Sequence, residues 1–261
     1  MDVNRGIAMT RRRFYAPPEA LSLGKESVTL SAEETRHARD VLRLERGEDV
    51  YVFDGQGHEY RCVIAELNRD SVKVDVFEQV EPAHPESRLD LTLCVALLKG
   101  EKFDLVVQKA TELGATRFIP VLTDRADVRI RSSDDAKRKL MRWQRIALEA
   151  TKQCGRARLM KIDAPVAFAE LIDRAEQGDE LRLIFAEREG SLFSEVLKDF
   201  ELMPAKAIAS IGPEGGWTDG EIDEANENGW RIVTLGGRTL RAETAAIVAA
   251  TLLQHRFGDL A

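Results

Sequence analysis

The sequence predicts an α/β fold in two domains, a small β-rich domain over residues 1–82 and a parallel-sheet domain over residues 83–261. Up to about residue 80, apolar and polar residues alternate in short runs, which is typical of half-buried strands. Beyond that point strand-like runs alternate with helix-like runs, which favours a mostly parallel sheet. Between the two regions, "EPAHPESR" (81–88) combines two prolines with charges and indicates a linker.

The first domain is predicted to be a compact, barrel-like sheet with one helix. The segment "SAEETRHARDVLRL" opens with Ser31 and has Glu34 three residues later, which predicts a capping box and a helix. Three strand-like runs follow, separated by "GQG" and "NRD" turns: "DVYVFD", "EYRCVIAEL" and "SVKVDVFEQV".

The second domain is predicted to alternate strands and helices to its end. The expected strands are "LDLTLCVALL", "TRFIPVL", "LRLIFAE", "AKAIASI" and "RIVTL". The expected helices are "EKFDLVVQKATEL", "DDAKRKLMRWQRIALEATKQC", "TDGEIDEANENG" and "AETAAIVAATLLQHRF". The last helix is apolar on nearly every face, so we expect it to be buried against the sheet and a partner.

Composition excludes several classes of protein. No apolar run approaches the roughly 20 residues of a membrane span, and the N-terminus lacks the apolar core of a signal peptide, so we expect a cytoplasmic protein. The three cysteines have no CxxC spacing and the four histidines lie far apart, so we expect no metal site. The net charge is −7, yet residues 125–158 carry eleven basic against four acidic side chains. This basic segment fits an RNA-binding surface or an ordinary solvated face.

A glycine-rich loop follows the predicted strand "AKAIASI", in the stretch "AIASIGPEGGWTDGEI" (207–222). It lacks the lysine of a P-loop and the spacing of a dinucleotide fingerprint, and Glu214 in its middle would repel a phosphate. A neutral or cationic ligand therefore fits better. The alternative is a tight turn before a helix, since Thr218 and Glu221 form a second predicted capping box.

A second glycine loop, "LGGRTLRAETAA" (235–246), brings Arg241, Glu243 and Thr244 to the start of the last helix. A glutamate in a first turn complements the helix dipole, and a threonine there can cap the helix. Two glycine loops after neighbouring parallel strands would form the floor and wall of one small-ligand site.

These two segments, "IGPEGGWTDGEI" and "LGGRTLRAETAAIVAATLLQHRFGDL", resemble the signature of the ribosomal small subunit methyltransferase E family. That family comprises the 16S rRNA uridine-N3 methyltransferases of the SPOUT superfamily. The resemblance extends over nearly the whole chain through "RRRFYAPP", "HARDVLRLERGEDVYVFDGQGHEYRCVI", "LLKGEKFDLVVQKATELGATRFIPVLTDRADVR" and "WQRIALEATKQCGRARL". It implies an N-terminal PUA-like barrel domain, a SPOUT domain with a C-terminal trefoil knot, a homodimer and S-adenosyl-L-methionine (SAM) as cofactor.

The resemblance also implies residue roles. The cofactor-binding residues would be Phe185, Ala186, Ile211, Gly212, Glu214, Gly216, Leu235, Gly236, Leu240, Arg241, Glu243, Thr244 and Ala245. Whether Glu214 touches the cofactor or holds its loop stays open. Methyl transfer to N3 needs the N3 proton removed and the uracil anion stabilised. We expect Arg241 to stabilise that anion, its alternative role being to order Glu243, and either Glu243 or Glu149 to act as the base.

The implied partner is 16S rRNA or the small ribosomal subunit, bound with a strong dependence on salt. The RNA-contacting residues would be Arg11, Arg13, Arg36, Arg39, Arg43, Arg125, Arg129, Arg156 and Arg158. Of these, Arg36, Arg39 and Arg43 have the spacing of one helix face. We expect Trp143 and Trp217 to pack internally rather than stack on a base. The competing classes are a non-catalytic RNA-binding module and a nucleotide-dependent enzyme, and the methylated position could differ from uridine N3.

Overall fold

The protein is described by a computed structural model over residues 11–21, 26–173, 180–188, 190–196, 198 and 204–260. Residues 1–10, on which part of the signal-peptide expectation rests, lie outside these ranges. Two compact units are present: Met1–Glu86 with Thr151–Leu159, and Ser87–Ala150 with Met160–Ala261. Residues 83–86 and 151–159 were expected in the second domain, whereas both segments pack with the first unit. The guanidinium of Arg13 accounts for part of this, because it donates to the carbonyl oxygens of Thr151 and Arg156 at 3.1 and 2.7 Å.

The first unit contains, in its described part, a five-stranded sheet in the order β1-β3-β4-β5-β2. Its strands are β1 (Arg13–Tyr15), β2 (Ser27–Thr29), β3 (Asp49–Phe53), β4 (Glu59–Leu67) and β5 (Val72–Val80), with a short 3₁₀ helix η1 at Pro18–Ala20. Strands β1 and β3 are parallel and the other pairs are antiparallel. Alternate side chains such as Val50, Val52 and Val74 point into the core, as the period-2 pattern predicts.

The helix of this unit departs from the predicted one. Ser31 caps it by accepting from the amide of Glu34 at 3.2 Å, but the α-helix α1 (Ala32–Arg36) then widens into a π-helix, η2 (His37–Val41). Arg43 follows with a left-handed φ of 52°. The predicted single face of Arg36, Arg39 and Arg43 is therefore wrong, because that spacing requires an uninterrupted 3.6-residue turn.

The second unit is built on an eight-stranded sheet whose pairs are all parallel, in the order β11-β13-β10-β12-β6-β7-β8 with β9 paired to β7. The strands are β6 (Asp90–Ala96), β7 (Arg117–Leu122), β8 (Lys161–Ile162), β9 (Val166–Ala167), β10 (Leu181–Phe185), β11 (Ser191–Leu192), β12 (Lys206–Ile211) and β13 (Arg231–Thr234). The alternating strand and helix pattern predicted this parallel α/β architecture, and the structure confirms it. The short strands β8, β9 and β11 were not predicted.

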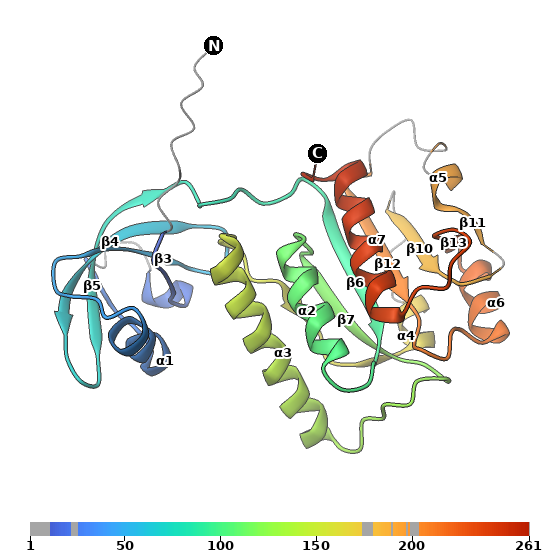
Figure 1. The fold of residues 1–261 in the computed structure, drawn as a ribbon, viewed down its shortest axis with the longest axis horizontal. Helices are drawn as coiled ribbons and strands as arrows, with labels where there is room; N and C mark the ends of the chain where they lie inside the picture. The colour runs from blue at the N-terminus through green and yellow to red at the C-terminus, as the bar shows by residue number, and fades with distance from the viewer. Residues whose placement is uncertain are drawn as a thin grey trace, which may run out of the picture. The chain divides into compact units, whose positions relative to one another are not determined.

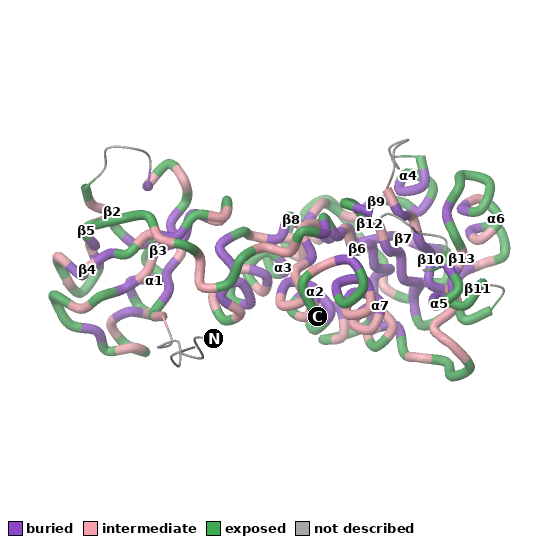
Figure 2. The backbone as a smooth tube through the Cα atoms, turned by 90° about the horizontal axis from the view of Figure 1, so that it is seen from above, coloured by how far each residue is buried: buried purple, intermediate pink, exposed green. Residues whose placement is uncertain are grey.

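Helices cover both faces of this sheet (Figure 1). They are α2 (Lys102–Glu112), α3 (Ser133–Cys154), α4 (Phe168–Asp173), α5 (Phe193–Val196), α6 (Asp219–Glu227) and α7 (Ala242–Phe257). Helices α2 and α7 lie side by side and share one core with Leu93 of β6, whereas α4 and α6 share another core with the adjacent Cys94. The strands between these layers are mostly buried (Figure 2), which is why they read as continuous apolar runs.

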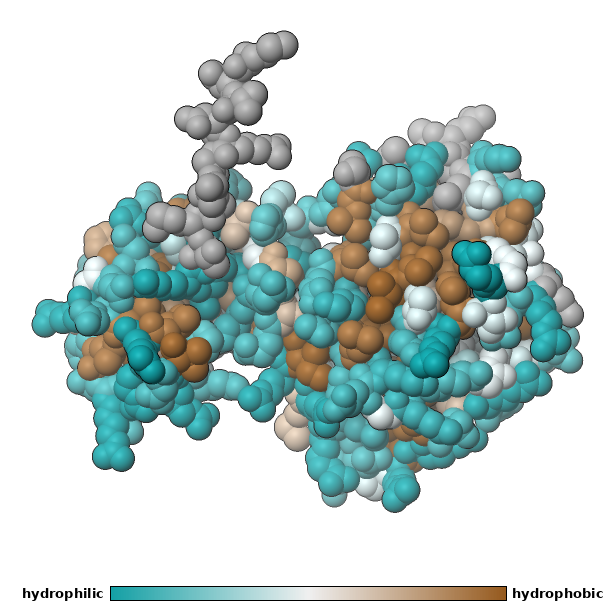
Figure 3. Space-filling view, in the orientation of Figure 1, coloured by the Kyte–Doolittle hydropathy of each residue, from teal (hydrophilic) through white to brown (hydrophobic). Residues whose placement is uncertain are grey.

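Helix α7 is only half enclosed by its own chain. Its small residues Ala246, Ala249 and Ala250 are buried against the sheet and α2, while Ile247 and Leu252 remain partly exposed. Figure 3 shows apolar side chains gathered over this helix. Among the helices in the described ranges, none combines the length and apolarity of a membrane crossing.

Candidate functional site

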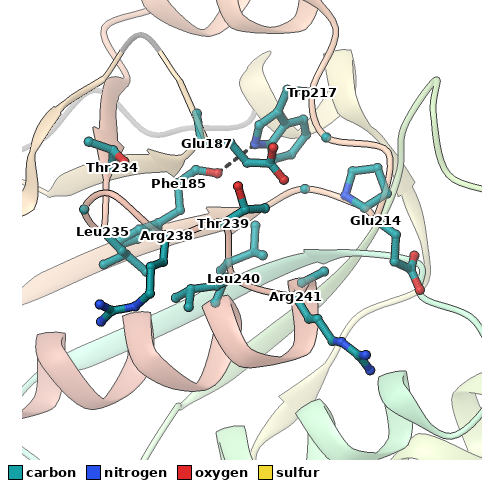
Figure 4. Close-up of a pocket in the computed structure, with 18 of the residues that line it drawn as sticks. Phe185, Glu187, Glu214, Trp217, Thr234, Leu235, Arg238, Thr239, Leu240 and Arg241 are labelled. Atoms are coloured by element: carbon teal, nitrogen blue, oxygen red, sulfur yellow. Dashed lines mark hydrogen bonds between the residues drawn. The ribbon is translucent and has the colours of Figure 1, made fainter.

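A cavity of about 470 Å³ opens at the edge of the second unit's sheet where β10, β12 and β13 end (Figure 4). These strands are adjacent in the order β13-β10-β12, and parallel strands bring their carboxyl ends to one edge. The cavity is lined by Lys102, by Phe185–Glu187, by residues 211–214, 216 and 217, and by residues 234–242 and 245. Its volume is in the range of small-molecule sites.

The loop after β12 is shaped by its glycines. Gly216 has a φ of +70° and donates its amide to the carbonyl oxygen of Pro213 at 3.0 Å, which closes a tight turn. Gly212 lies against the Trp217 ring, because a Cβ at this position would be only 3.0 Å from the ring. The glycines therefore let the backbone approach both the cavity and the indole closely.

Trp217 ties this loop to the neighbouring strand. Its Nε1 donates to the carbonyl oxygen of Phe185 at 3.0 Å, and its ring packs on Phe168 with centroids 5.1 Å apart. The side chain is buried, and Trp143 is likewise buried against Phe103 at 4.6 Å. The prediction that both tryptophans pack internally is confirmed.

The predicted capping box at the start of α6 is present and braces the same loop. Thr218 accepts from the amide of Glu221 at 3.1 Å, and the Glu221 carboxylate accepts from the Thr218 amide at 2.8 Å. The other Glu221 oxygen accepts from the amide of Asp124, and Arg125 donates to the carbonyl oxygen of Trp217 at 2.8 Å. The segment after β7 thus holds the loop from outside the cavity.

Glu214 faces helix α2 and forms an ion pair there. Its Oε1 lies 3.0 Å from Nζ of Lys102, the first residue of that helix. Burial alone would raise the pKa of Glu214, but hydrogen bonds led by the one from Lys102 outweigh it, and the pKa lies below its ordinary value. Of the two roles left open for Glu214, this contact favours holding the loop.

The loop after β13 offers unpaired groups to the cavity. Within the described residues, the backbone amides and carbonyls of residues 236–239 form no hydrogen bond, and neither do the guanidinium groups of Arg238 and Arg241. Gly236 has a φ of +111°, which only glycine adopts without strain. Arg238 and Arg241 project in different directions (Figure 4).

Most of the predicted cofactor residues line this cavity. Glu243 and Thr244 are the exceptions, because both lie in the first turn of α7 behind Arg241, which occupies the N-cap position. Thr244 makes no capping hydrogen bond, so its predicted capping role is wrong. One oxygen of Glu243 is buried without a hydrogen-bond partner among the described residues. Glu149 is exposed on α3 and is absent from the lining.

Sequence reasoning missed nine lining residues: Lys102, Glu187, Pro213, Trp217, Thr234, Gly237, Arg238, Thr239 and Ala242. Six of them belong to the two glycine loops and could have been included as neighbours, and Thr234 is the last residue of β13. Glu187 is the last residue of the expected strand "LRLIFAE". Lys102 matches a position of the family that the chain resembles, but no role could be derived for it, because only the packing of α2 brings it to the loop after β12.

The predicted RNA-contacting arginines divide into three groups, which are buried, engaged at the surface, or exposed. Arg13 and Arg156 are only 7% and 5% exposed, and their guanidinium groups pair with Glu59 and Glu86 at 2.8 and 2.7 Å. Their prediction as RNA contacts is therefore corrected to a structural role, since buried and paired guanidinium groups have no free donor surface. Two further arginines are engaged at the surface of the first unit, Arg11 with Glu59 and Glu81, and Arg39 with Asp40 and Arg69.

The remaining arginines are exposed. In the described part of the first unit, Arg36, Arg43 and Arg158 form no side-chain hydrogen bond or ion pair. In the second unit, Arg129 folds back on the carbonyl oxygens of Thr123 and Asp124 at 3.3 and 3.0 Å.

Other reactive groups lie away from the cavity. Among the described residues no three His, Cys, Asp or Glu side chains are placed to hold a metal ion. Burial, reinforced by Asp75, raises the pKa of Cys62 to about 12, and burial also raises the pKa of Cys94.

The chain is similar to known proteins over most of its length. Residues 85–254 match the RNA methyltransferase domain and residues 30–77 match the RNA methyltransferase PUA domain. The fold and the cavity are thus those of an RNA methyltransferase with a PUA-type domain. The ribosomal RNA small subunit methyltransferase E of Synechocystis sp. is 36% identical over 244 residues, 93% of this chain and 77% of that protein. The chain belongs to the ribosomal RNA small subunit methyltransferase E family.

Further relatives and two solved structures are similar to this chain over nearly its whole length. The protein of the same name from Bacillus subtilis is 29% identical over 254 residues, 96% of this chain and 95% of that protein. The crystal structure of the Neisseria gonorrhoeae enzyme bound to S-adenosyl methionine superposes with a TM-score of 0.86 at 31% identity, covering 96% of this chain and 100% of that one. A putative methyltransferase from Legionella pneumophila, in complex with SAM, has the same TM-score at 32% identity, covering 97% and 100%.

Proposed function

We propose that this protein transfers the methyl group of SAM to N3 of a uridine in the 16S rRNA of the small ribosomal subunit. The observation that carries the proposal is the cavity itself, formed by three loops at the ends of β10, β12 and β13. Its apolar walls and unpaired backbone groups suit an uncharged purine nucleoside better than a polyphosphate. The relatives that were solved with SAM support the same cofactor.

The residues present fit this cofactor. Leu235 and Leu240 supply apolar surface for a flat base, and the open backbone at Gly236 leaves room for close approach, since a Cβ there would meet nothing within 4 Å. Trp217 and the Lys102–Glu214 pair keep the loop after β12 in place. Once bound, SAM supplies an activated methyl group on a sulfonium.

Arg241 is the residue we assign to the acceptor base. It lines the cavity, is exposed and is unpaired within the described chain, so its guanidinium is free to stabilise the negative charge that develops on uracil as the N3 proton leaves. Of the two acids considered as the base, Glu243 is preferred, because it follows Arg241 by two residues in α7 whereas Glu149 lies on α3.

RNA binding is assigned partly to the first unit, whose family match supports a PUA-like, barrel-forming sheet. Arg36, Arg43 and Arg158 are the candidates, since all three are exposed and none is paired within the described residues. Contacts of this kind bind phosphates without reading sequence and weaken steeply with salt.

The proposal includes a trefoil knot and a homodimer. Support for the knot is the path of the chain after β13, which returns past β10 so that α7 packs on β12, β6 and α2. Support for the dimer is the partly exposed apolar side of α7 carrying Ile247, Val248 and Leu252. A ribosomal RNA substrate places the reaction in the cytoplasm.

The test is mass spectrometry of rRNA nucleosides from a deletion strain complemented with the wild-type protein or with Arg241→Ala. We expect 3-methyluridine to disappear in the deletion, to return with the wild type and to stay low with the variant. Arg256→Ala, which removes an exposed arginine near the other end of α7 and outside the cavity, is the matched control and should restore the nucleoside. Unchanged 3-methyluridine in the deletion would refute the acceptor, and full restoration by Arg241→Ala would remove Arg241 from the mechanism.

Calorimetry with SAM and its demethylated product separates this enzyme from a non-catalytic RNA-binding module. We expect heat of binding for both ligands with the wild type and with Arg241→Ala. A wild-type protein that binds RNA and neither ligand would favour the binding module.

A further inference from the structure

One acidic side chain of the cavity, Glu187, has no partner among the residues that the structure describes. Glu187 is the second residue after β10, and its carboxylate lies among the residues of the cavity (Figure 4). It forms no hydrogen bond or ion pair with any residue in the described ranges. The other acid of the lining, Glu214, is already paired with Lys102 at 3.0 Å. Glu187 is therefore the acid left to meet a ligand.

The backbone just before Glu187 is held on both sides. The carbonyl oxygen of Phe185 accepts from Nε1 of Trp217 at 3.0 Å, which fixes it to the loop after β12. The amide of Ala186 donates to the carbonyl oxygen of Val233 at 2.9 Å, which fixes it to β13. Because β10 lies between β12 and β13, Glu187 stands between the two glycine loops. Its carboxylate is thus presented from an anchored backbone.

The chemistry of a carboxylate limits what it can recognise here. An ionised carboxylate only accepts hydrogen bonds, and it repels phosphates and other carboxylates. The nearest cations of the lining, Arg238 and Arg241, project away from it (Figure 4). Two adjacent hydroxyl groups satisfy both of its oxygens at once, and an acid after a parallel strand holds ribose hydroxyls in dinucleotide-binding sheets in this way.

We propose that Glu187 recognises the ribose of the cofactor by accepting hydrogen bonds from its 2′- and 3′-hydroxyl groups. The inference rests on the proposed function, because it requires a nucleoside in this cavity. It assigns Glu187 as a residue that selects a ribonucleoside over deoxy analogues. The competing role is attraction of the positive sulfonium, which the demethylated product S-adenosylhomocysteine lacks.

The test is isothermal titration calorimetry of the full chain with SAM, S-adenosylhomocysteine and the 2′,3′-dideoxy analogue of the latter. We expect Glu187→Ala to weaken the binding of SAM and of S-adenosylhomocysteine by the same factor. This factor should be about 10- to 100-fold, the effect expected when hydrogen bonds to a charged group are lost. The dideoxy analogue should bind the wild type and Glu187→Ala equally. Glu187→Gln retains one acceptor oxygen, so its affinity for SAM and S-adenosylhomocysteine should lie between the affinities of the wild type and Glu187→Ala.

Glu227→Ala is the matched control, because Glu227 is also exposed but lies at the end of α6 outside the cavity. It should bind all three ligands as the wild type does. Equal SAM affinity for Glu187→Ala and the wild type would overturn the inference, and so would a loss much larger for SAM than for S-adenosylhomocysteine. Failure of the wild type to bind either ligand would instead refute the proposed function, and the inference with it.

Discussion

Substituting alanine for Gly212 is expected to destabilise the protein and to weaken SAM binding together. The added Cβ would lie 3.0 Å from Cε2, 3.1 Å from Nε1 and 3.3 Å from Cδ2 of Trp217. The ring has little freedom to retreat, because it is 8% exposed, packs on Phe168 and is hydrogen-bonded to Phe185. Overpacking of a fixed site costs about 1–3 kcal/mol.

This strain should appear in two measurements. In a protein of this size each kcal/mol lowers Tm by roughly 2–4 °C in differential scanning calorimetry. Because Trp217 joins two of the three loops, part of the strain should also raise the Kd for SAM, about tenfold for each 1.4 kcal/mol. Gly212→Ala with wild-type Tm and wild-type SAM affinity would refute the idea that the indole is fixed.

Gly220→Ala is the matched control for this substitution. Gly220 is the second residue of α6, and a Cβ there would meet nothing within 4 Å. Alanine is favoured over glycine inside a helix by about 0.5–1 kcal/mol, so this variant should raise Tm and leave SAM binding unchanged.

Three further predictions concern named contacts. Lys102→Met and Glu214→Gln should each weaken SAM binding by a few-fold, as expected for a partly exposed ion pair, and the exchange Lys102→Glu with Glu214→Lys should restore it in calorimetry. Because the pKa of Glu214 is lowered on folding, its ionised carboxylate stabilises the protein fully above the ordinary pKa of about 4.5. This stabilisation is lost as the pH falls through the lowered pKa of the folded state. The free energies of unfolding of the wild type and Glu214→Gln, measured in urea, should therefore converge in acid. Arg13→Met should cost about 1.5–3 kcal/mol in urea unfolding, because it removes the donor to one oxygen of the buried Glu59 and leaves that carboxylate with Arg11 as its one ion-pair partner in the described chain; a variant as stable as the wild type would refute the structural role of the Arg13–Glu59 pair.

The sequence by itself determined the five longer strands of the second unit's sheet, β6, β7, β10, β12 and β13, and the position of the candidate site. Buried parallel strands require long apolar runs, and "AKAIASI" and "RIVTL" supply them close to the observed strands β12 and β13. The two glycine loops were recognisable because glycine spacing reports a local backbone requirement, and parallel topology then brings both to one edge. The capping box at Thr218 was equally local.

The tertiary structure alone decided which charged side chains are free. Arg13 and Arg36 look alike in sequence, yet one is buried against Glu59 and the other is exposed, because pairing depends on partners dozens of residues away. The same reason separates Glu214, held by Lys102 of α2, from Glu187, which has no partner within the described ranges. Propensity and spacing act over one or two turns of chain, whereas the electrostatics of a site depends on distances that only the packed fold sets.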